Sequence, residues 1–195
     1  VSGNEMNHLL KHNVHQTISD IFIPAGGRPR TLNAGNIEDF LDENGDPTSR
    51  AIVEGANLYL TEDAREILED MDVIIIKDSS ANKGGVICSS YEVLCGLTLS
   101  EKDFTKNKKV LVKEILKILE NKAKLEAKLL LETHEETGAP LSMLSDEISA
   151  KINLFTDQIY AHLKDKKLSQ KSSDPLTKCF LAHCPPTLSK SHRAK

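Results

Sequence analysis

The stretch over residues 73–97 limits the possible folds of this chain more than any other part of the sequence. It opens with the apolar run Val73-Ile74-Ile75-Ile76, which is short, β-branched and followed by charge, as expected of a fully buried strand. A polar loop over residues 79–83 leads to Gly84-Gly85, and the apolar spacing that follows predicts a helix packed on a sheet. In open α/β sheets, ligands bind at such junctions. A plain strand-to-helix connection explains this stretch equally well on its own.

The same order of strand, small-residue turn and helix occurs twice before this stretch. Residues 18–23 form the first expected strand, which ends in Pro24-Ala25-Gly26-Gly27 because Pro24 cannot donate to a sheet ladder. Residues 51–53 form the second strand, which ends in Glu54-Gly55-Ala56-Asn57. Three such repeats predict an α/β fold in which a parallel sheet carries helices on its faces.

Two helix starts in this region carry capping signals. Asn36 is the expected N-cap of a short helix over residues 37–41. Thr61 is the expected N-cap of a helix over residues 62–70, whose first turn is acidic.

The composition excludes several classes of function. The net charge is −4, aromatic residues make up 4% and tryptophan is absent, so the sequence has neither a nucleic-acid footprint nor a base-stacking platform. No apolar run is long enough to cross a membrane, and no secretory leader is recognised. Cys88 and Cys95 lie among apolar residues, which is typical of free thiols in a reducing compartment. We therefore expect a cytoplasmic chain without a nucleic-acid or membrane partner. Its first residue is not Met, and we expect it to be a piece of a longer protein.

The second half of the chain is helical and rich in lysine and glutamate. Its pattern predicts two helices separated by Gly138-Ala139-Pro140, the second capped by Ser145. Apolar residues of the second helix form a narrow stripe that suits either packing within this chain or a helix of another chain. The expected organisation is a nucleotide-binding domain over 1–99, a helical hairpin over 100–164, and a basic tail or the start of a further helical region over 165–195.

Two groups of residues contain side chains that can bind metals. His8, His12 and His15 lack a carboxylate or thiol to complete a site, and Cys179, His183, Cys184 and His192 match no strong zinc spacing. No metal site is predicted from either group.

The candidate binding residues follow the three expected strands. Pro24, Ala25 and Gly26 come after the first strand, Asn57 after the second and Asn82 after the third. Because an asparagine side chain has both a donor and an acceptor, two of them at adjacent strand ends suit a carboxamide and a ribose hydroxyl. That pair of groups occurs together in a nicotinamide nucleotide.

The motifs of these loops resemble those of a known family. The run IFIPAGG, then IVEGAN with Thr61 after it, then SANKGGVICSSYEVL, is similar in order and spacing to the second half of the coenzyme domain of glutamate dehydrogenase over residues 20–97. The small hexameric enzymes usually have Gly-Pro after EGAN, and Asn-Ala-Gly-Gly in the last loop. This chain has Leu58-Tyr59 and Asn82-Lys83-Gly84-Gly85, and together with GGRP and EGANLYLT it resembles the large NAD-specific enzymes of the fungal and bacterial type.

The resemblance implies a partial Rossmann-type parallel sheet flanked by helices and followed by a helical hairpin. It also implies that Pro24, Ala25 and Gly26 line the adenosine ribose and phosphate side of the coenzyme, while Asn57 and Asn82 hold the nicotinamide ribose or carboxamide. Ser89 matches a serine that contacts the distal carboxylate of the substrate.

The further implications concern the longer parent protein. They are the cofactor NAD, oxidative deamination of L-glutamate to 2-oxoglutarate and ammonia, and a homo-oligomer. The family's catalytic residues and the GxGxxG loop find no match in this sequence, so the substrate domain in the remainder of the parent chain is an expected partner and the chain alone is expected to be inactive. The competing hypothesis is a non-catalytic α/β module whose helical hairpin mediates assembly.

Overall fold

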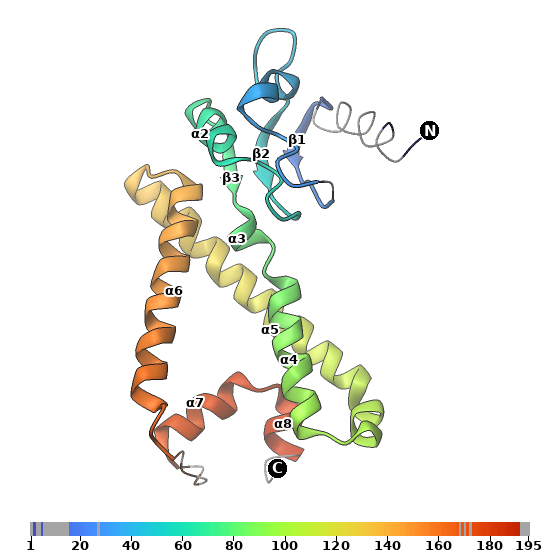
Figure 1. Ribbon diagram of the computed structural model, residues 1–195, viewed down its shortest axis with the longest axis vertical. Coiled ribbons are helices and arrows are strands. Elements are labelled where there is room, and N and C mark those ends of the chain that lie inside the picture. Colours follow the sequence, from blue (N-terminus) through green and yellow to red (C-terminus); the bar gives the residue numbers. More distant parts are fainter. Residues whose placement is uncertain are drawn as a thin grey trace. The chain divides into compact units, whose positions relative to one another are not determined.

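The computed structural model describes residues 2, 5, 16–26, 28–167, 169, 171 and 173–191. The chain forms two compact units (Figure 1). The first comprises Val1–Lys83 with Ala127–Ser149, and the second comprises Gly84–Glu126 with Ala150–Lys195. His8, His12, His15 and His192, which were weighed as metal ligands, lie outside the described residues. The predicted domain boundaries at 99 and 164 stay predictions of how the parent protein is organised.

The first unit is built on a three-stranded parallel sheet. Its strands are β1 (Ser19–Phe22), β2 (Ser49–Val53) and β3 (Ile74–Ile76), in the order β1-β2-β3. Phe22 is paired with Ile52, and Ile52 with Ile75, both in parallel register. The predicted α/β class and partial Rossmann-type sheet are confirmed. Strands β1 and β3 are shorter than the sequence indicated, whereas β2 is longer because it already begins at Ser49.

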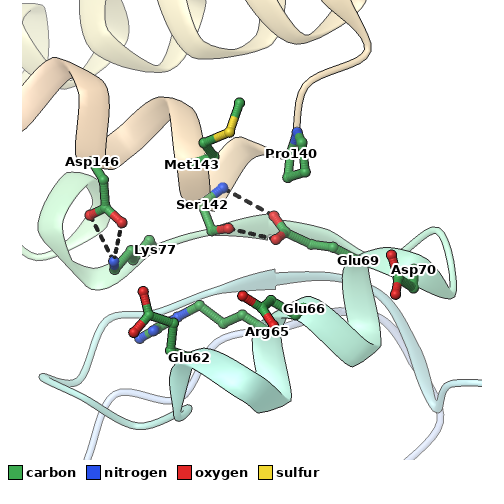
Figure 2. Close-up of a pocket in the computed structure, with 10 residues that line it drawn as sticks. All are labelled: Glu62, Arg65, Glu66, Glu69, Asp70, Lys77, Pro140, Ser142, Met143 and Asp146. Atoms are coloured by element: carbon green, nitrogen blue, oxygen red, sulfur yellow. Dashed lines mark hydrogen bonds and ion pairs between the residues drawn. The ribbon is translucent and has the colours of Figure 1, made fainter.

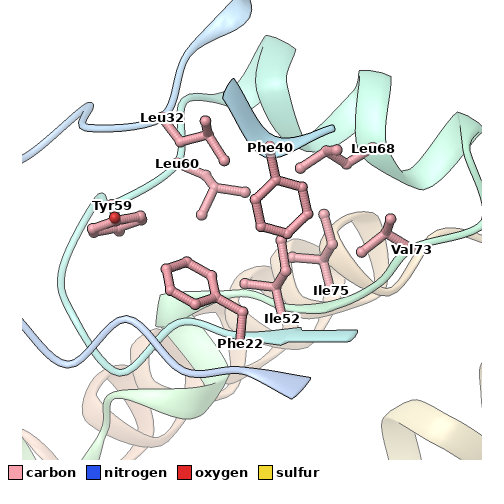
Figure 3. Close-up of a cluster of buried hydrophobic side chains, with 9 residues drawn as sticks. All are labelled: Phe22, Leu32, Phe40, Ile52, Tyr59, Leu60, Leu68, Val73 and Ile75. Carbon is pink, nitrogen blue, oxygen red and sulfur yellow. The ribbon is translucent and has the colours of Figure 1, made fainter. Parts of the chain in front are cut away.

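One face of this sheet forms the main hydrophobic core. The side chains of Phe22, Ile52 and Ile75 point to that face, which is covered by η1, a 3-10 helix (Ala34–Phe40), and by α2 (Glu62–Asp70). Figure 3 shows the cluster filling the space between strands and helices; its members are Phe22, Leu32, Phe40, Ile52, Tyr59, Leu60, Leu68, Val73 and Ile75. On the opposite face, Ile21 is 54% and Ile74 44% exposed.

The connections differ from the sequence prediction in their details. The N-cap of η1 is Asn33, and Asn36 accepts a hydrogen bond from the Asn33 backbone N–H to complete a capping box, so the prediction of Asn36 as the cap was wrong. Thr61 is the N-cap residue of α2, but its hydroxyl donates to the Asp63 carboxylate instead of capping the backbone. The segment after β3, expected as a loop, contains the short helix α3 (Asp78–Ala81).

The first unit also contains the turn between two long helices, α5 (Glu101–Thr137) and α6 (Leu141–Leu163). Gly138 adopts φ = 69°, a left-handed conformation that glycine takes without steric cost, and its N–H donates to the His134 carbonyl. Leu130, Leu141 and Leu144 form a small apolar cluster beside this turn. The predicted cap Ser145 was wrong, because α6 already begins at Leu141.

The second unit contains helices and, in its described residues, no strand. It comprises α4 (Gly84–Thr98), residues 101–126 of α5, the remainder of α6, α7 (Pro175–His183) and α8 (Pro186–Ser191). Its core is the cluster of Cys95, Leu111, Cys184 and Leu188. Helices α7 and α8 occupy the region predicted as a basic tail or the start of a further helical region.

The four cysteines are free thiols, with Cys95 and Cys184 buried and Cys88 half-buried. In the part of the chain that the structure describes, the apolar length needed to cross a membrane is reached by none of the helices.

Candidate functional site

Three loops meet at the carboxyl edge of the sheet, as parallel strands require. Pro24 is buried after β1, and Ala25 and Gly26 are exposed beyond it. A Cβ at Gly55, just after β2, would lie 3.2 Å from the Pro24 carbonyl oxygen and 3.6 Å from the Ala25 Cα. The glycine therefore lets the loop after β2 lie directly against the loop after β1.

The two asparagines predicted as binding residues lie side by side. The Asn82 side-chain N–H₂ donates to the Asn57 Oδ1 over 2.5 Å. Asn57 is exposed at the end of β2, and Asn82 is the half-buried C-cap residue of α3. The bond uses one donor and one acceptor of the pair, so each amide keeps its second polar atom for a ligand. The loops after β2 and β3 thus present two coupled amides at one edge of the sheet.

Ser89 belongs to the second unit, on α4. It is exposed, and its hydroxyl donates to the Val86 carbonyl of its own helix over 2.9 Å, as helical serines commonly do. Of the predicted site residues, the structure brings together Pro24, Ala25, Gly26, Asn57 and Asn82 in the first unit. The substrate role of Ser89 stays a prediction.

Three charged residues that were not predicted as site residues lie next to the loops that carry the two asparagines. Glu54 is fully buried and Arg65 is 4% exposed. The Arg65 Nε and Nη2 donate to the two Glu54 carboxylate oxygens over 2.8 and 3.2 Å, and the Arg65 Nη2 lies 3.9 Å from the Asp78 Oδ1. We call Glu54, Arg65 and Asp78 the buried charge cluster.

The carboxylates of this cluster also accept backbone hydrogen bonds from the site loops. Glu54 accepts from Leu60 N–H over 3.0 Å and from Asp78 N–H over 3.3 Å. Asp78 accepts from Leu58 N–H over 2.8 Å. Removing one partner of such a buried ion pair typically costs about 3–5 kcal/mol, because it leaves an uncompensated charge.

Leu58 has a backbone conformation that its side chain disfavours. Its φ is 53°, in the left-handed region, where the small hexameric enzymes noted above usually have glycine. Its N–H is held by Asp78, and its carbonyl accepts from Arg30 N–H over 2.6 Å. Strained backbone persists where neighbouring contacts over-determine it, and here it follows Asn57 directly.

Comparison with known proteins agrees with this geometry. The family model of the Glutamate/Leucine/Phenylalanine/Valine dehydrogenases matches residues 2–140. The chain belongs to this dehydrogenase family. The chain is 38% identical over 157 residues to a probable NAD-specific glutamate dehydrogenase of Schizosaccharomyces pombe, covering 75% of this chain and 14% of that protein. It is 40% identical over 169 residues to glutamate dehydrogenase 2 of Dictyostelium discoideum, covering 80% of this chain and 16% of that protein.

The NAD-specific glutamate dehydrogenase of Saccharomyces cerevisiae is 37% identical over 166 residues. This dehydrogenase chain thus spans about one-seventh of the length of the curated relatives it matches. The family match includes all three loops of the site and the buried charge cluster, and it ends at the turn between α5 and α6.

A cavity of about 300 Å³ lies between α2 and the first turn of α6 in the same unit (Figure 2). Figure 2 shows two contacts beside it: Lys77 Nζ binds both Asp146 carboxylate oxygens over 2.7 Å, and Glu69 accepts from the Ser142 backbone and hydroxyl. The cations of this cavity, Lys77 and Arg65, are therefore each paired with a carboxylate. We interpret it as the surface that fastens α6 to the dehydrogenase sheet.

The remaining chemistry of the site is that of neutral polar groups. Burial raises the pKa of Tyr59, so this core phenol stays protonated at neutral pH. Among the described residues, no group of three or more His, Cys, Asp or Glu side chains is placed to hold a metal ion. The asparagine pair and the backbone of the three loops supply neutral donors and acceptors at this edge of the sheet.

Proposed function

We propose that this chain supplies part of the NAD site of an NAD-dependent glutamate dehydrogenase. The observation that supports it most is the hydrogen-bonded pair Asn57–Asn82, at adjacent carboxyl ends of a parallel sheet and beside the Pro24-Ala25 backbone. The reaction of the longer protein is oxidative deamination of L-glutamate to 2-oxoglutarate and ammonia. The relatives' names supply both the coenzyme and the substrate class.

The residues divide by the part of the ligand that each meets. Pro24, Ala25 and Gly26 face the adenosine ribose and phosphates through their backbone. Asn57 and Asn82 hold the nicotinamide ribose or carboxamide, and Ser89 donates to the distal carboxylate of glutamate. No residue of this chain is assigned a catalytic step, so the chain alone is inactive and the substrate domain of the parent protein completes the site. The parent is a cytoplasmic homo-oligomer, in line with the free thiols.

Kinetics of two variants of the full-length dehydrogenase test these assignments. Asn82→Ala removes a neutral hydrogen bond worth about 0.5–1.5 kcal/mol, so the kcat/KM for NAD should fall several-fold with a much smaller change for glutamate. Ser89→Ala should do the reverse and raise the KM for glutamate, because a bond to a charged group is worth about 1.5–3 kcal/mol. Unchanged NAD kinetics in Asn82→Ala would remove the asparagine pair from the coenzyme site. Equal effects of Ser89→Ala on both substrates would leave its hydroxyl with the bond to Val86.

A second candidate function is a non-catalytic module that assembles through its helical hairpin. The observation in its favour is the stripe on α6, where Ile152 is 49%, Phe155 63% and Ile159 56% exposed. Gel filtration of the full-length protein, alongside titration with NAD, separates the two. An assembly module gives an oligomer that binds no nucleotide, and loss of the oligomer in Phe155→Ser without loss of NAD binding assigns assembly to α6.

A further inference from the structure

The buried charge cluster is hydrogen-bonded to the backbone of both loops that carry the asparagine pair. We propose that Glu54, Arg65 and Asp78 are positioning residues that set how Asn57 and Asn82 are presented to the coenzyme. This inference rests on the proposed function, because it concerns the same coenzyme site.

The burial of the cluster excludes direct contact between its central pair and a nucleotide. Glu54 has no exposed surface and Arg65 is 4% exposed. Both Glu54 oxygens are occupied by Arg65 and by the backbone N–H groups of Leu60 and Asp78. Any influence of this pair on a ligand must therefore pass through the loops that it holds.

Asp78 connects the cluster to both asparagines. Its Oδ2 accepts from the N–H of Leu58, the residue directly after Asn57, over 2.8 Å. Its backbone carbonyl accepts from the N–H of Asn82 over 2.8 Å, because Asp78 is the first residue of the single helical turn α3 that Asn82 ends. Asp78 therefore makes one hydrogen bond to the residue after Asn57 and another to the backbone of Asn82 itself.

Glu54 and Arg65 fix Asp78 in turn. Glu54 accepts from the Asp78 N–H, and the Arg65 guanidinium lies 3.9 Å from the Asp78 carboxylate. Glu54 also accepts from the Leu60 N–H. The loop that carries Asn57 therefore donates to two carboxylates, that of Glu54 after β2 and that of Asp78 after β3. This arrangement supplies what a binding site requires, which is side chains held to a fraction of an ångström by a second layer of bonds.

The first test is Asp78→Asn in the full-length dehydrogenase. An amide has one carbonyl oxygen, whereas Asp78 accepts separately from Leu58 N–H through Oδ2 and from Ser79 N–H through Oδ1. One of the two bonds is therefore lost. We expect the KM for NAD to rise about 5-fold, the scale of one hydrogen bond, while the KM for glutamate changes less than about 2-fold.

Asp42→Asn is the matched control. Asp42 also accepts from two backbone N–H groups, those of Asn44 over 2.8 Å and Asp46 over 3.0 Å, in a loop before β2 that carries none of the candidate site residues. Both bonds are made to Oδ1, which the carbonyl oxygen of asparagine can replace, so this variant removes a negative charge from a different loop and should leave the KM for NAD unchanged. Equal effects of the two variants on NAD would overturn the inference.

A double-mutant cycle separates positioning from general stabilisation. If Asp78 acts through the asparagine pair, its 5-fold effect should shrink below about 2-fold when Asn82 is already alanine, because there is little left to position. A purely structural role gives the same fold-change in both backgrounds, and that result would overturn the inference. Should Asp78→Asn fail to fold, Arg65→Lys takes its place: it keeps the charge beside Glu54 but loses the two-pronged contact. Its effect on NAD should disappear in the same background.

The failure of this inference is distinguishable from the failure of the proposed function. If Asn57→Ala and Asn82→Ala leave NAD kinetics unchanged, the asparagine pair is not in the coenzyme site and both conclusions fall. If those variants weaken NAD use while Asp78→Asn and Arg65→Lys act additively or not at all, only the positioning role falls.

Discussion

The first unit packs a parallel sheet against helical segments, whereas the described part of the second unit packs helices alone. Nine buried residues make up the sheet core, against four in the cluster of Cys95, Leu111, Cys184 and Leu188. Helix α4 of the second unit also leaves large apolar side chains in solvent, with Val86 73% and Leu97 80% exposed. The asparagine pair is carried by the unit with the larger core and the buried charge cluster, so the candidate site lies in the more strongly supported unit.

The largest expected effect is a fall in the free energy of unfolding when a large apolar side chain is removed from the core of either unit. Ile52→Ala should lower the free energy of unfolding of the first unit by about 4 kcal/mol, and Leu111→Ala that of the second by about 2 kcal/mol, because a small cluster collapses more readily around a cavity. Hydrogen exchange of peptides from each unit measures both. Ile21→Ala, in the same sheet but 54% exposed, is the control and should cost on the order of 0.5 kcal/mol. If Leu111→Ala accelerates hydrogen exchange in β2 as strongly as Ile52→Ala does, the two units unfold together in one cooperative step.

A smaller effect is expected from helix caps that occur in both units, in which a glutamate of one helix accepts hydrogen bonds from the start of another. Glu69 of α2 accepts from the N–H and the hydroxyl of Ser142 at the start of α6, and Glu114 of α5 does the same for Thr187 at the start of α8. Each carboxylate therefore caps the N-terminus of another helix. Glu69→Gln and Glu114→Gln should each cost about 1 kcal/mol, measured as faster exchange in the first turn of the capped helix. Glu66→Gln, one turn earlier on α2, should leave the exchange of α6 unchanged; a similar loss would show a general charge effect instead of a cap.

The smallest effect expected is a pH dependence confined to the second unit. Burial, with a contribution from Lys122, lowers the pKa of His183, whose ring stacks on Tyr91 and whose carbonyl accepts from the Tyr91 hydroxyl. Below the ordinary histidine pKa of about 6.5 the unfolded chain takes up a proton that the folded chain resists, so stability is lost as the pH falls from about 6.5 toward the lower folded pKa. Exchange of α7 should accelerate between pH 7.5 and 5.5 beyond its intrinsic change. His183→Gln should remove the excess, and an identical profile in that variant would assign the effect to other groups.

The parallel sheet could be predicted from the sequence because it depends on local patterns, whereas the roles of the loop residues after its strands stay predictions. The apolar runs over residues 51–53 and 73–76 and the small residues after them are local signals of strands and turns. The expectation of a fully buried third strand was wrong, because Ile74 is 44% exposed. One error fell on a position where two residues offered the same chemistry. Asn33 and Asn36 both suit a cap, and the structure uses them together as a capping box. Leu32, directly before Asn33, is buried in the core, and the capping pattern alone does not contain this tertiary contact.

The buried charge cluster was missed because single-sequence patterns treat charge as a sign of exposure. A signal was nevertheless present. Arg65 lies between Ala64 and Leu68 on the apolar side of α2, and Glu54 directly follows a buried strand. An arginine on a core-facing position and a carboxylate at a buried strand end each need a partner, so the pairing of the two was available from the sequence.

The contacts of the first unit also imply an order in which the chain closes. Glu54 and Arg65 are 11 residues apart and Asn57 and Asn82 are 25 apart, whereas Glu69 and Ser142 are separated by 73 residues. The entropic free-energy cost of closing the longest of these loops is about 1.7 kcal/mol higher than that of closing the shortest. Since contacts that are close in sequence form fastest and synthesis proceeds from the N-terminus, residues 49–82 should be assembled on the ribosome before α6 has been translated. The three loops of the candidate site would then already be in place when the turn between α5 and α6 docks.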